Sequence, residues 1–505
     1  MGKYFEDIHA TAQSQLDGIG AVPEDSVEVA EKRAGITFAE LMELGKALCA
    51  QLRYREAIDV YTMAIRTKPD EMSGYRQRAA RYLATLQPRE AMLDFAKCRQ
   101  LGADEQDISY RMGLCHYFAG EYEACMEEME YCFPLCDEEM GIAAIFWHTL
   151  SAWRCSGRTV LLEEKYHSGM QVGHHTAYET VMALAAGTMQ MEEMKERLHD
   201  EAEDLEFSLL AYGTAAVLAK QGKAEEAEIL ISEVLRRDSF WISFGYLAAW
   251  NDRRHCKRKE KQEWKTEYVS WRKRWQQAYE QASFYHSEKN SSAFWDAQAK
   301  SLAKGAQGTA AQEAGRAMGL GEERVKLLTD ILSLLSDGKE CKSVIDIGCG
   351  TGAYIPALAE KFEKVTALDS SEEMLKCCKE TVAEAGYRNV SFLAADYMTF
   401  AAEHKFDVVV ACLNPATYCP DGFDRLLAYA NRYVVYMSTD QSLEEVAEES
   451  VYHGTNLIEY PYRYLEELGY QPVRIPFFCE VKNAAGKSVL KKFAYVICNI
   501  GSCRV

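Results

Sequence analysis

Apolar and polar positions follow two different rhythms along the chain, and the change of rhythm divides it into two halves. In the second half, short β-branched runs alternate with stretches whose apolar positions repeat at helical spacing. The runs lie at 343–347, 364–369, 390–394, 406–412 and 433–437, and the helical stretches at 355–362, 372–385 and 423–431. This alternation predicts a doubly wound parallel sheet. Two further runs, 473–481 and 489–497, flank a turn at 483–486 and predict a long hairpin.

The first half repeats itself at an interval of 34 residues. Small residues recur at two positions of the repeat, first at Gly45, Ala79 and Gly113 and again at Ala57, Ala91 and Cys125. This interval is typical of tetratricopeptide repeats (TPRs), in which pairs of antiparallel helices stack on one another. We therefore expect a TPR-like, right-handed α-solenoid over residues 37–255, capped by a polar leader at 1–36. The fold class is then α plus α/β.

The inner groove of such a solenoid is a candidate binding surface. Repeat positions that usually face the groove carry Met42, Lys46, Arg76, Leu83, Tyr110, Leu114 and Tyr117. This set is apolar with a few cations, which suits a protein or peptide partner. The alternative is a groove filled by the chain's own helices.

A basic and aromatic stretch connects the two halves. Trp264, Tyr268, Trp271, Trp275 and Tyr279 recur every three or four residues and form one helical stripe. We expect a connecting helix at 256–290 that packs this stripe on the solenoid and shows its cations to water. An RNA contact through 253–275 is the alternative.

Composition excludes several other classes of protein. The chain has 505 residues, 48% of them hydrophobic, and a formal net charge of −20. Two or three globular domains are expected at this length, and the acidic balance argues against a general nucleic-acid or acidic-membrane binder. The 17 cysteines form no metal-binding Cys-x-x-Cys pattern, and no long apolar run predicts a membrane span. Free thiols in the cytoplasm, with no metal, fit this composition.

The segment 343–354 carries the most specific chemistry. Its apolar strand ends at Asp346 and enters a glycine-rich turn of the form G-x-G-x-G. Dinucleotide sites use G-x-G-x-x-G, and an acid before the loop would repel a diphosphate but suit a ligand with an ammonium group. The segment resembles motif I of the class I S-adenosylmethionine (SAM)-dependent methyltransferases. A nicotinamide-dependent oxidoreductase is disfavoured by the glycine spacing.

The resemblance extends over about residues 291–505 and implies a Rossmann-like, seven-stranded methyltransferase domain with SAM as cofactor. Further strands end in acids at Asp369, which is expected to bind ribose, and at Asp396, which is expected to bind adenine. The segment 294–299 resembles the helix that leads into many small bacterial methyltransferases, with Gln298 where that pattern often has Arg. The cofactor-binding residues implied are Asp346, Gly348, Cys349, Gly350, Gly352, Asp369, Ser370, Ala395, Asp396, Tyr397 and Leu413.

The loop after the fourth strand is expected to face the methyl group. Asn414 and Pro415 resemble the start of the Asn-Pro-Pro-Tyr motif of methyltransferases that act on nitrogen, but Ala416 replaces the second proline and Tyr418 comes one residue late. We take Asn414 and Tyr418 as the catalytic candidates, against a rigid turn without catalytic duty. Further pocket candidates are Asp421, His453, Tyr460 and Tyr462.

These patterns together predict a cytoplasmic, SAM-dependent methyltransferase whose TPR domain recruits or orients a substrate or partner protein. The alternative is a scaffold protein whose methyltransferase-like domain binds SAM without transferring its methyl group. Neither the loop nor the groove chooses between a small molecule, a protein and RNA as the acceptor.

Overall fold

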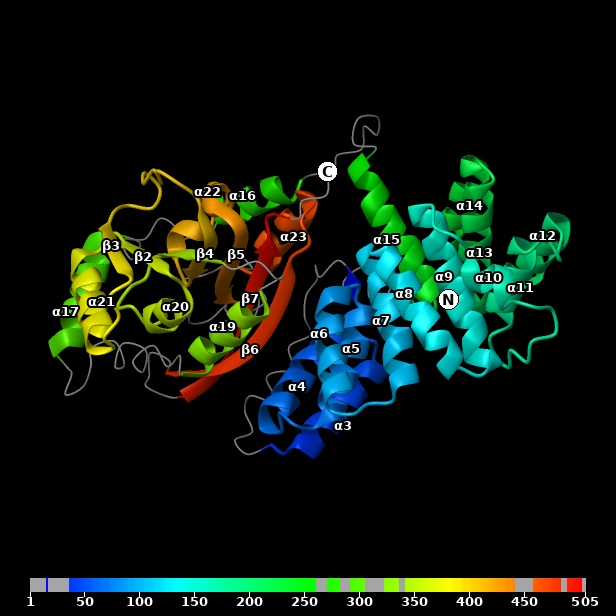
Figure 1. Cartoon of the computed structure of the whole chain (residues 1–505), viewed down its shortest axis with the longest axis horizontal. Coiled ribbons are helices and arrows are strands. Elements are labelled where there is room, and N and C mark those ends of the chain that lie inside the picture. The colour runs from blue at the N-terminus through cyan, green and yellow to red at the C-terminus, as the bar shows by residue number, and fades with distance from the viewer. Residues whose placement is uncertain are drawn as a thin grey trace. The chain divides into compact units, whose positions relative to one another are not determined.

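The computed structural model describes residues 15–16, 36–259, 270–281, 291–304, 322–335, 341–440, 457–482 and 488–501. These ranges belong to two compact units (Figure 1). The described residues up to 259 form a helical unit, and those from 270 onward form an α/β unit. This division confirms the predicted fold class of α plus α/β.

The helical unit consists of helix pairs whose close contacts are made by small residues. A Cβ on Gly45 would come within 2.4 Å of the Tyr61 ring, and one on Gly113 within 2.5 Å of the Met129 methyl group. Glycine at these repeat positions therefore lets the two helices of a pair approach. The pairs that carry the 34-residue interval are α3 (Phe38–Ala50) with α4 (Tyr54–Thr67), α5 (Met72–Ala84) with α6 (Pro88–Gln100), and α7 (Glu105–Ala119) with α8 (Tyr122–Cys132).

Later helices of the same unit cover the surface predicted as a groove. They are α9 (Glu138–Cys155), α10 (Val160–Glu164), α11 (Thr176–Ala185), α12 (Met191–Asp200), α13 (Asp204–Lys220), α14 (Ala224–Arg236) and α15 (Phe244–Lys259). The Phe244 ring lies 6.3 Å from those of both Phe118 and Trp147, and the Asn251 side chain donates to the Phe118 carbonyl at 3.0 Å. The Tyr117 and Tyr212 hydroxyls lie 2.6 Å apart.

Most of the predicted groove residues are consequently buried. Met42, Leu83, Tyr110, Leu114 and Tyr117 are at most 9% exposed, so they offer little surface to a peptide. This packing supports the interpretation in which the chain's own helices fill the groove. A protein partner, which stays a prediction, would need a different surface of the helical unit.

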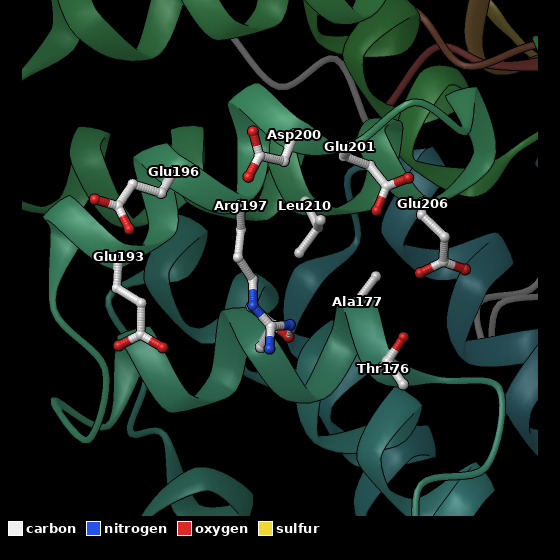
Figure 2. Close-up of a pocket in the computed structure, with 10 residues that line it drawn as sticks. Thr176, Ala177, Glu193, Glu196, Arg197, Asp200, Glu201, Glu206 and Leu210 are labelled. Atoms are coloured by element: carbon white, nitrogen blue, oxygen red, sulfur yellow. Dashed lines mark hydrogen bonds between the residues drawn. The ribbon is translucent and has the colours of Figure 1, made fainter.

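The helical unit also contains a cavity of about 370 Å³ bounded by α11, α12 and α13 (Figure 2). Most of the charged side chains that line it are acidic, namely Glu193, Glu196, Asp200, Glu201 and Glu206. Arg197 is the cation in this lining, and its guanidinium donates to the Thr180 hydroxyl at 2.9 Å. The cavity therefore has an acidic rim around one internally bonded arginine.

The structure describes only parts of the connecting stretch that the sequence predicts as one helix over 256–290. Helix α15 ends at Lys259, and α16 (Trp271–Gln281) belongs to the α/β unit, while Trp264 and Tyr268 fall outside the described residues. The Trp271 ring lies 6.1 Å from that of Tyr460, and Trp275 is fully buried. The expectation that these two aromatics pack on the solenoid is therefore wrong, because the α/β unit offers both an apolar surface and an acceptor for the Trp275 indole.

The α/β unit is built around a seven-stranded sheet in the order β3-β2-β1-β4-β5-β7-β6. Its strands are β1 (Ser343–Ile347), β2 (Lys364–Asp369), β3 (Val390–Ala394), β4 (Phe406–Cys412), β5 (Ala430–Thr439), β6 (Val473–Lys482) and β7 (Ser488–Asn499). The first five strands are parallel, and β7 runs antiparallel to both β5 and β6. The predicted strands and the final hairpin are thereby confirmed, although the turn at 483–486 lies outside the described residues.

The helices of this unit are α16, α17 (Ser292–Lys304), α19 (Glu322–Leu334), α20 (Ile355–Lys361), α21 (Glu372–Glu384), α22 (Pro420–Tyr429) and α23 (Glu459–Glu467). Along the sheet, the chain proceeds from β1 to β2 and β3 on one side and continues with β4 and β5 on the other. The carboxyl ends of β1 and β4 therefore flank the crevice where doubly wound sheets bind ligands. No helix in the described ranges is long and apolar enough to cross a membrane.

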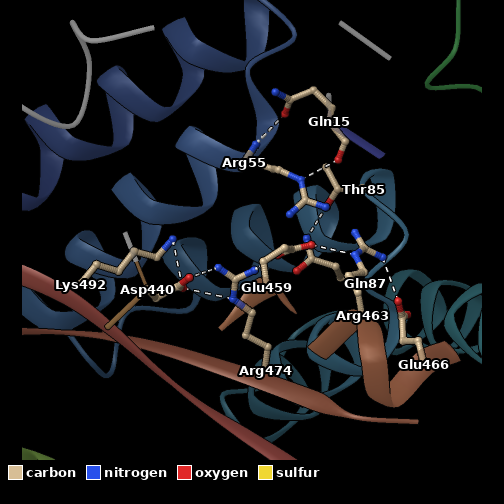
Figure 3. Close-up of polar contacts among 10 residues, drawn as sticks. All are labelled: Gln15, Arg55, Thr85, Gln87, Asp440, Glu459, Arg463, Glu466, Arg474 and Lys492. Carbon is tan, nitrogen blue, oxygen red and sulfur yellow. Dashed lines mark hydrogen bonds and ion pairs between the residues drawn. The ribbon is translucent and has the colours of Figure 1, made fainter. Parts of the chain in front are cut away.

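A buried charge network lies beyond the end of β5 (Figure 3). Arg474 of β6 donates to the Asp440 carboxylate and, at 2.8 Å, to Glu459 of α23. Glu459 also accepts from Arg463 at 2.7 Å. Burial of Asp440, which is 3% exposed, acts to raise its pKa, but the Arg474 and Lys492 cations lower it to about 2. The network thus ties the hairpin and α23 to the end of β5.

Candidate cofactor and active site

The glycine loop after β1 has the backbone conformation of a ligand cradle. Gly348, Gly350 and Gly352 all have positive φ, at 76°, 54° and 85°. A Cβ on Gly348 would come within 2.7 Å of the Asn414 amide, and one on Gly352 within 2.7 Å of the Cys378 sulfur. A Cβ on Gly350 would meet no atom of the described residues within 4 Å. Gly348 and Gly352 are therefore required by packing, whereas Gly350 borders open space that a ligand can fill.

Asp346 is a buried carboxylate with an unused acceptor. The residue is 1% exposed, and its Oδ2 has no hydrogen-bond partner within the described part of the chain. Burial and the charge of Asp369 together raise the pKa of Asp346 to about 7, although the Arg324 cation acts to lower it. A cationic ligand beside Oδ2 would stabilise the ionised form. The site is thus prepared for an ammonium group.

Asp369 at the end of β2 organises the second side of the crevice. Its carboxylate accepts from the Gly350 amide at 2.8 Å and from the Ser371 amide at 2.9 Å. Ser370 is exposed, and Asp369 is 9% exposed. Asp296 of α17 accepts from the Ser371 hydroxyl, so the predicted leading helix lies against this strand end. Asp369 therefore fixes the glycine loop and keeps acceptor capacity for a ligand hydroxyl.

The residues after β3 divide between the crevice and the core. The Ala395 amide donates to the Asp369 carbonyl at 3.1 Å, which places Ala395 and Asp396 beside the end of β2. Asp396 is exposed and accepts from the Met398 amide at 2.9 Å. Tyr397 is 3% exposed and donates to the Gly422 carbonyl at 2.7 Å. Tyr397 therefore packs in the core, whereas the neighbouring Met398 is exposed, and the expected place of Tyr397 beside a ligand stays a prediction.

The loop after β4 is locked to the glycine loop. Leu413 adopts a positive φ of 53°, and its amide donates to the Met437 carbonyl. The Asn414 side chain donates to the Ile347 carbonyl at 3.0 Å and accepts from the Ala416 amide at 3.0 Å. Because both ends of its amide are engaged, Asn414 serves as a brace in this structure. This arrangement matches the rigid-turn interpretation better than a clamp for a substrate nitrogen.

The other acceptor-side candidates are also held by the fold. Tyr418 is 2% exposed, and its carbonyl accepts from the Trp275 indole at 2.9 Å. Asp421 is exposed and pairs with Arg272, and Tyr462 is buried in the core. His453 lies outside the described residues. Tyr418 therefore does not present its ring to solvent, which weighs against the expected catalytic contact.

Arg324 is a site residue that the sequence did not reveal. It lies on α19, is 6% exposed, and its Nε has no hydrogen-bond partner among the residues described. Its guanidinium lies 4.9 Å from the centre of the Tyr354 ring and lowers the pKa of Asp346. A lone arginine before the first strand gives no periodic or motif signal, so only the three-dimensional arrangement brings it to the site.

Comparison with known proteins identifies the domain. Residues 344–435 match the family model described as "Methyltransferase domain". These residues are a methyltransferase domain. The match spans the glycine loop, the three strand-end acids Asp346, Asp369 and Asp396, and the loop after β4. The cofactor expected for a methyltransferase domain of this fold is SAM, and the resemblance stated from the sequence is confirmed.

Curated relatives share this domain at moderate identity. A ubiquinone biosynthesis O-methyltransferase from Idiomarina loihiensis is 35% identical over 88 residues, which is 17% of this chain and 35% of that protein. A 2-heptyl-1-hydroxyquinolin-4(1H)-one methyltransferase from Mycobacteroides abscessus is 33% identical over 82 residues, 16% of this chain and 36% of that protein. The chain thus spans about a third of these relatives' length.

Among solved structures, the magnesium protoporphyrin IX methyltransferase of Synechocystis PCC 6803 aligns at 16% identity with a TM-score of 0.30. This alignment covers 41% of the present chain and 95% of that one.

The residues of the crevice fit SAM. The unpartnered Oδ2 of Asp346 suits the ammonium group, the open space over Gly350 leaves room for the ligand, and Asp369 can accept from ribose hydroxyls. Asp396 stands exposed at the next strand end, where the resemblance places the adenine. Among the described residues, no group of three or more His, Cys, Asp or Glu side chains has a metal-binding arrangement.

Proposed function

We propose that this protein transfers a methyl group from SAM to an acceptor that docks beside the loop after β4. The observation that carries the proposal is Asp346, a buried carboxylate with a free oxygen at the carboxyl end of the central strand of a methyltransferase domain. A bound SAM supplies an activated sulfonium methyl group. The protein then has to orient an acceptor in line with this group and exclude water.

Each crevice residue has a role in this proposal. Asp346 binds the ammonium group, and Arg324 stands beside it as the cation available to the ligand's carboxylate. Asp369 binds the ribose hydroxyls while it holds the Gly350 amide. Asp396 and Met398 border the adenine. Binding therefore uses charges of both signs, which match the zwitterionic end of SAM.

The braced loop after β4 positions the acceptor in this account. Asn414 links this loop to the carboxyl end of β1, and Trp275 holds the Tyr418 carbonyl. Such a loop orients an acceptor through its backbone and shape, because the side chains of Asn414 and Tyr418 are engaged or buried. An acceptor that already carries a reactive lone pair needs no further base.

The helical unit is proposed to bind a protein that delivers or constitutes the acceptor. Its predicted groove is filled, so the proposed contact lies on its outer surface, where the acidic cavity of α11–α13 favours a basic partner. The described cysteines are free thiols, which supports a cytoplasmic location.

One observation favours the second candidate, a SAM-binding scaffold without transfer. Both polar atoms of the Asn414 side chain are satisfied internally, so the loop provides no clear catalytic amide. The two functions differ in what happens to the methyl group. Both predict binding of SAM, but only the enzyme consumes it.

The deciding experiment incubates the full chain with SAM labelled in its methyl group and a fractionated cell extract. The enzyme is expected to move label into one class of extract component, and Gly350→Val is expected to abolish this transfer. SAM binding without transfer in any fraction would support the scaffold. Binding of NADH without binding of SAM would contradict both.

A further inference from the structure

Two thiols lie in contact at the end of α8, in the helical unit and outside the site described above. The sulfurs of Cys132 and Cys136 are 3.5 Å apart, in the turn that leads from α8 to α9. Cys136 also lies 3.3 Å from the Cys132 carbonyl, and Cys132 lies 3.5 Å from the Gln106 carbonyl. A disulfide bond has a length of about 2.05 Å, so rotation of the two side chains brings the sulfurs within bonding distance.

The two thiols differ in their access to solvent. Cys132 is fully buried, whereas Cys136 is partly exposed in a segment whose neighbours Pro134, Leu135 and Asp137 are exposed. A hydrogen bond from Cys132 lowers the pKa of Cys136 and outweighs the opposing effects of burial and of Asp137. Cys136 therefore has the properties of an attacking thiolate, and Cys132 those of a resolving thiol behind it.

Other described cysteines lack this combination of access and partner. Cys155 is partly exposed, but its sulfur contacts the thioether of Met126, at 3.6 Å. Cys349 of the glycine loop and Cys378 of α21 interact with each other, but they are 6% and 0% exposed. Cys155 therefore serves as the matched control, because it is a partly exposed thiol whose sulfur contacts a thioether and not a second thiol.

We propose that Cys132 and Cys136 form an oxidation-sensitive dithiol that a hydroperoxide converts into an intrachain disulfide. The Cys136 thiolate attacks the peroxide, breaks its O–O bond and becomes a sulfenic acid, while the peroxide's other oxygen leaves as water or alcohol after taking up a proton. The Cys132 sulfur then attacks the Cys136 sulfur, forms the S–S bond and displaces water. In total two thiols lose two electrons and two protons, and one peroxide is reduced.

The test treats the full chain with hydrogen peroxide and digests it with a protease that cleaves after glutamate. Cleavage after Glu130 and Glu138 releases residues 131–138, in which Cys132 and Cys136 are the only cysteines. We expect this fragment to lose two hydrogen atoms about tenfold or more faster than Cys155 is oxidised. Cys132→Ser should instead accumulate sulfenic acid at Cys136, trapped by dimedone, and Cys136→Ser should leave Cys132 reduced.

Phenylarsine oxide, which bridges neighbouring thiols, provides a second measurement on the unmodified chain. We expect one equivalent to bind at this fragment and to protect it from peroxide, with Cys155→Ser behaving as the wild type. Because both wild-type measurements are independent of the variants, they test the dithiol even if Cys132→Ser folds poorly. Equal oxidation rates at the fragment and at Cys155, or a fragment that remains a dithiol while Cys155 is oxidised, would overturn the proposal.

Discussion

Replacing Asp346 by asparagine tests the electrostatics of the site through stability as well as binding. The substitution keeps the shape of the side chain and removes a carboxyl that is 1% exposed and whose pKa is raised from 3.8 to about 7. At about 1.36 kcal/mol per pKa unit, ionising this carboxyl in the folded protein costs on the order of 4 kcal/mol.

The stability of the protein should fall with rising pH, because the pKa of Asp346 is higher in the folded than in the unfolded protein. Below pH 3.8, Asp346 is neutral in both the folded and the unfolded protein, so its ionisation costs no stability. As the pH rises from there to about 7, the unfolded protein releases the proton while the folded protein keeps it, and the free energy of unfolding falls. Between pH 5.5 and pH 8, the wild type should therefore lose about 2 kcal/mol that Asp346→Asn retains. Hydrogen exchange of a peptide covering β1 reports this loss for the α/β unit alone, as a change of about thirtyfold in protection.

The same substitution should weaken SAM binding, although it preserves stability at high pH. Asp346→Asn is expected to weaken SAM by about 1–3 kcal/mol, because a charge-assisted contact is lost. The wild type's affinity should rise with pH up to about 7, where Asp346 ionises. Asp330→Asn, an exposed acid on α19, is the matched control and should change neither property. Equal pH dependence of protection in wild type and Asp346→Asn would refute the reasoning.

Four further substitutions test neighbouring claims. Gly350→Val should abolish SAM binding in calorimetry, because its side chain enters the open space, and retained affinity would contradict this placement. Since Gly350 has a positive φ, valine is strained there, and circular dichroism is used to confirm that the variant is folded. Asp369→Asn should weaken SAM by about 1–3 kcal/mol, measured in the same titration, and an unchanged constant would exclude a ribose contact. Asp440→Asn should destabilise the α/β unit by about 3–5 kcal/mol in urea unfolding at pH 7, because Arg474 loses a buried partner. The difference in unfolding free energy between wild type and variant should shrink as the pH falls from about 4 towards 2, and a difference that does not change with pH would exclude the ion pair. Trp275→Phe should raise the rate of hydrogen exchange in residues 413–419 by roughly fivefold, because the hydrogen bond from the indole to the Tyr418 carbonyl, about 1 kcal/mol, is lost. An unchanged exchange rate would show that the indole does not hold this loop.

The sheet of the α/β unit could be predicted because its signals are local. Strands β2, β3 and β4 begin and end where the apolar runs do, at Lys364–Asp369, Val390–Ala394 and Phe406–Cys412. The glycines at 348, 350 and 352 were also informative, since each has a positive φ in the structure. A pattern of this kind reports backbone geometry directly.

Roles that depend on distant contacts could not be predicted. Asn414 matches a catalytic pattern in sequence, yet its side chain is engaged by Ile347 and Ala416. Trp275 has the periodicity of an aromatic stripe, which does not say which unit it packs on. Arg324 shows no local signal, and its importance follows from burial beside Asp346. In each case tertiary packing decides the role.

The most direct test of the central claim is a crystal structure of the full chain with SAM. The account predicts the ammonium group at Oδ2 of Asp346, the ribose at Asp369, and the methyl group directed at the loop after β4. A crevice at the ends of β1 and β4 that stays empty at saturating SAM, or SAM bound elsewhere on the chain, would contradict it.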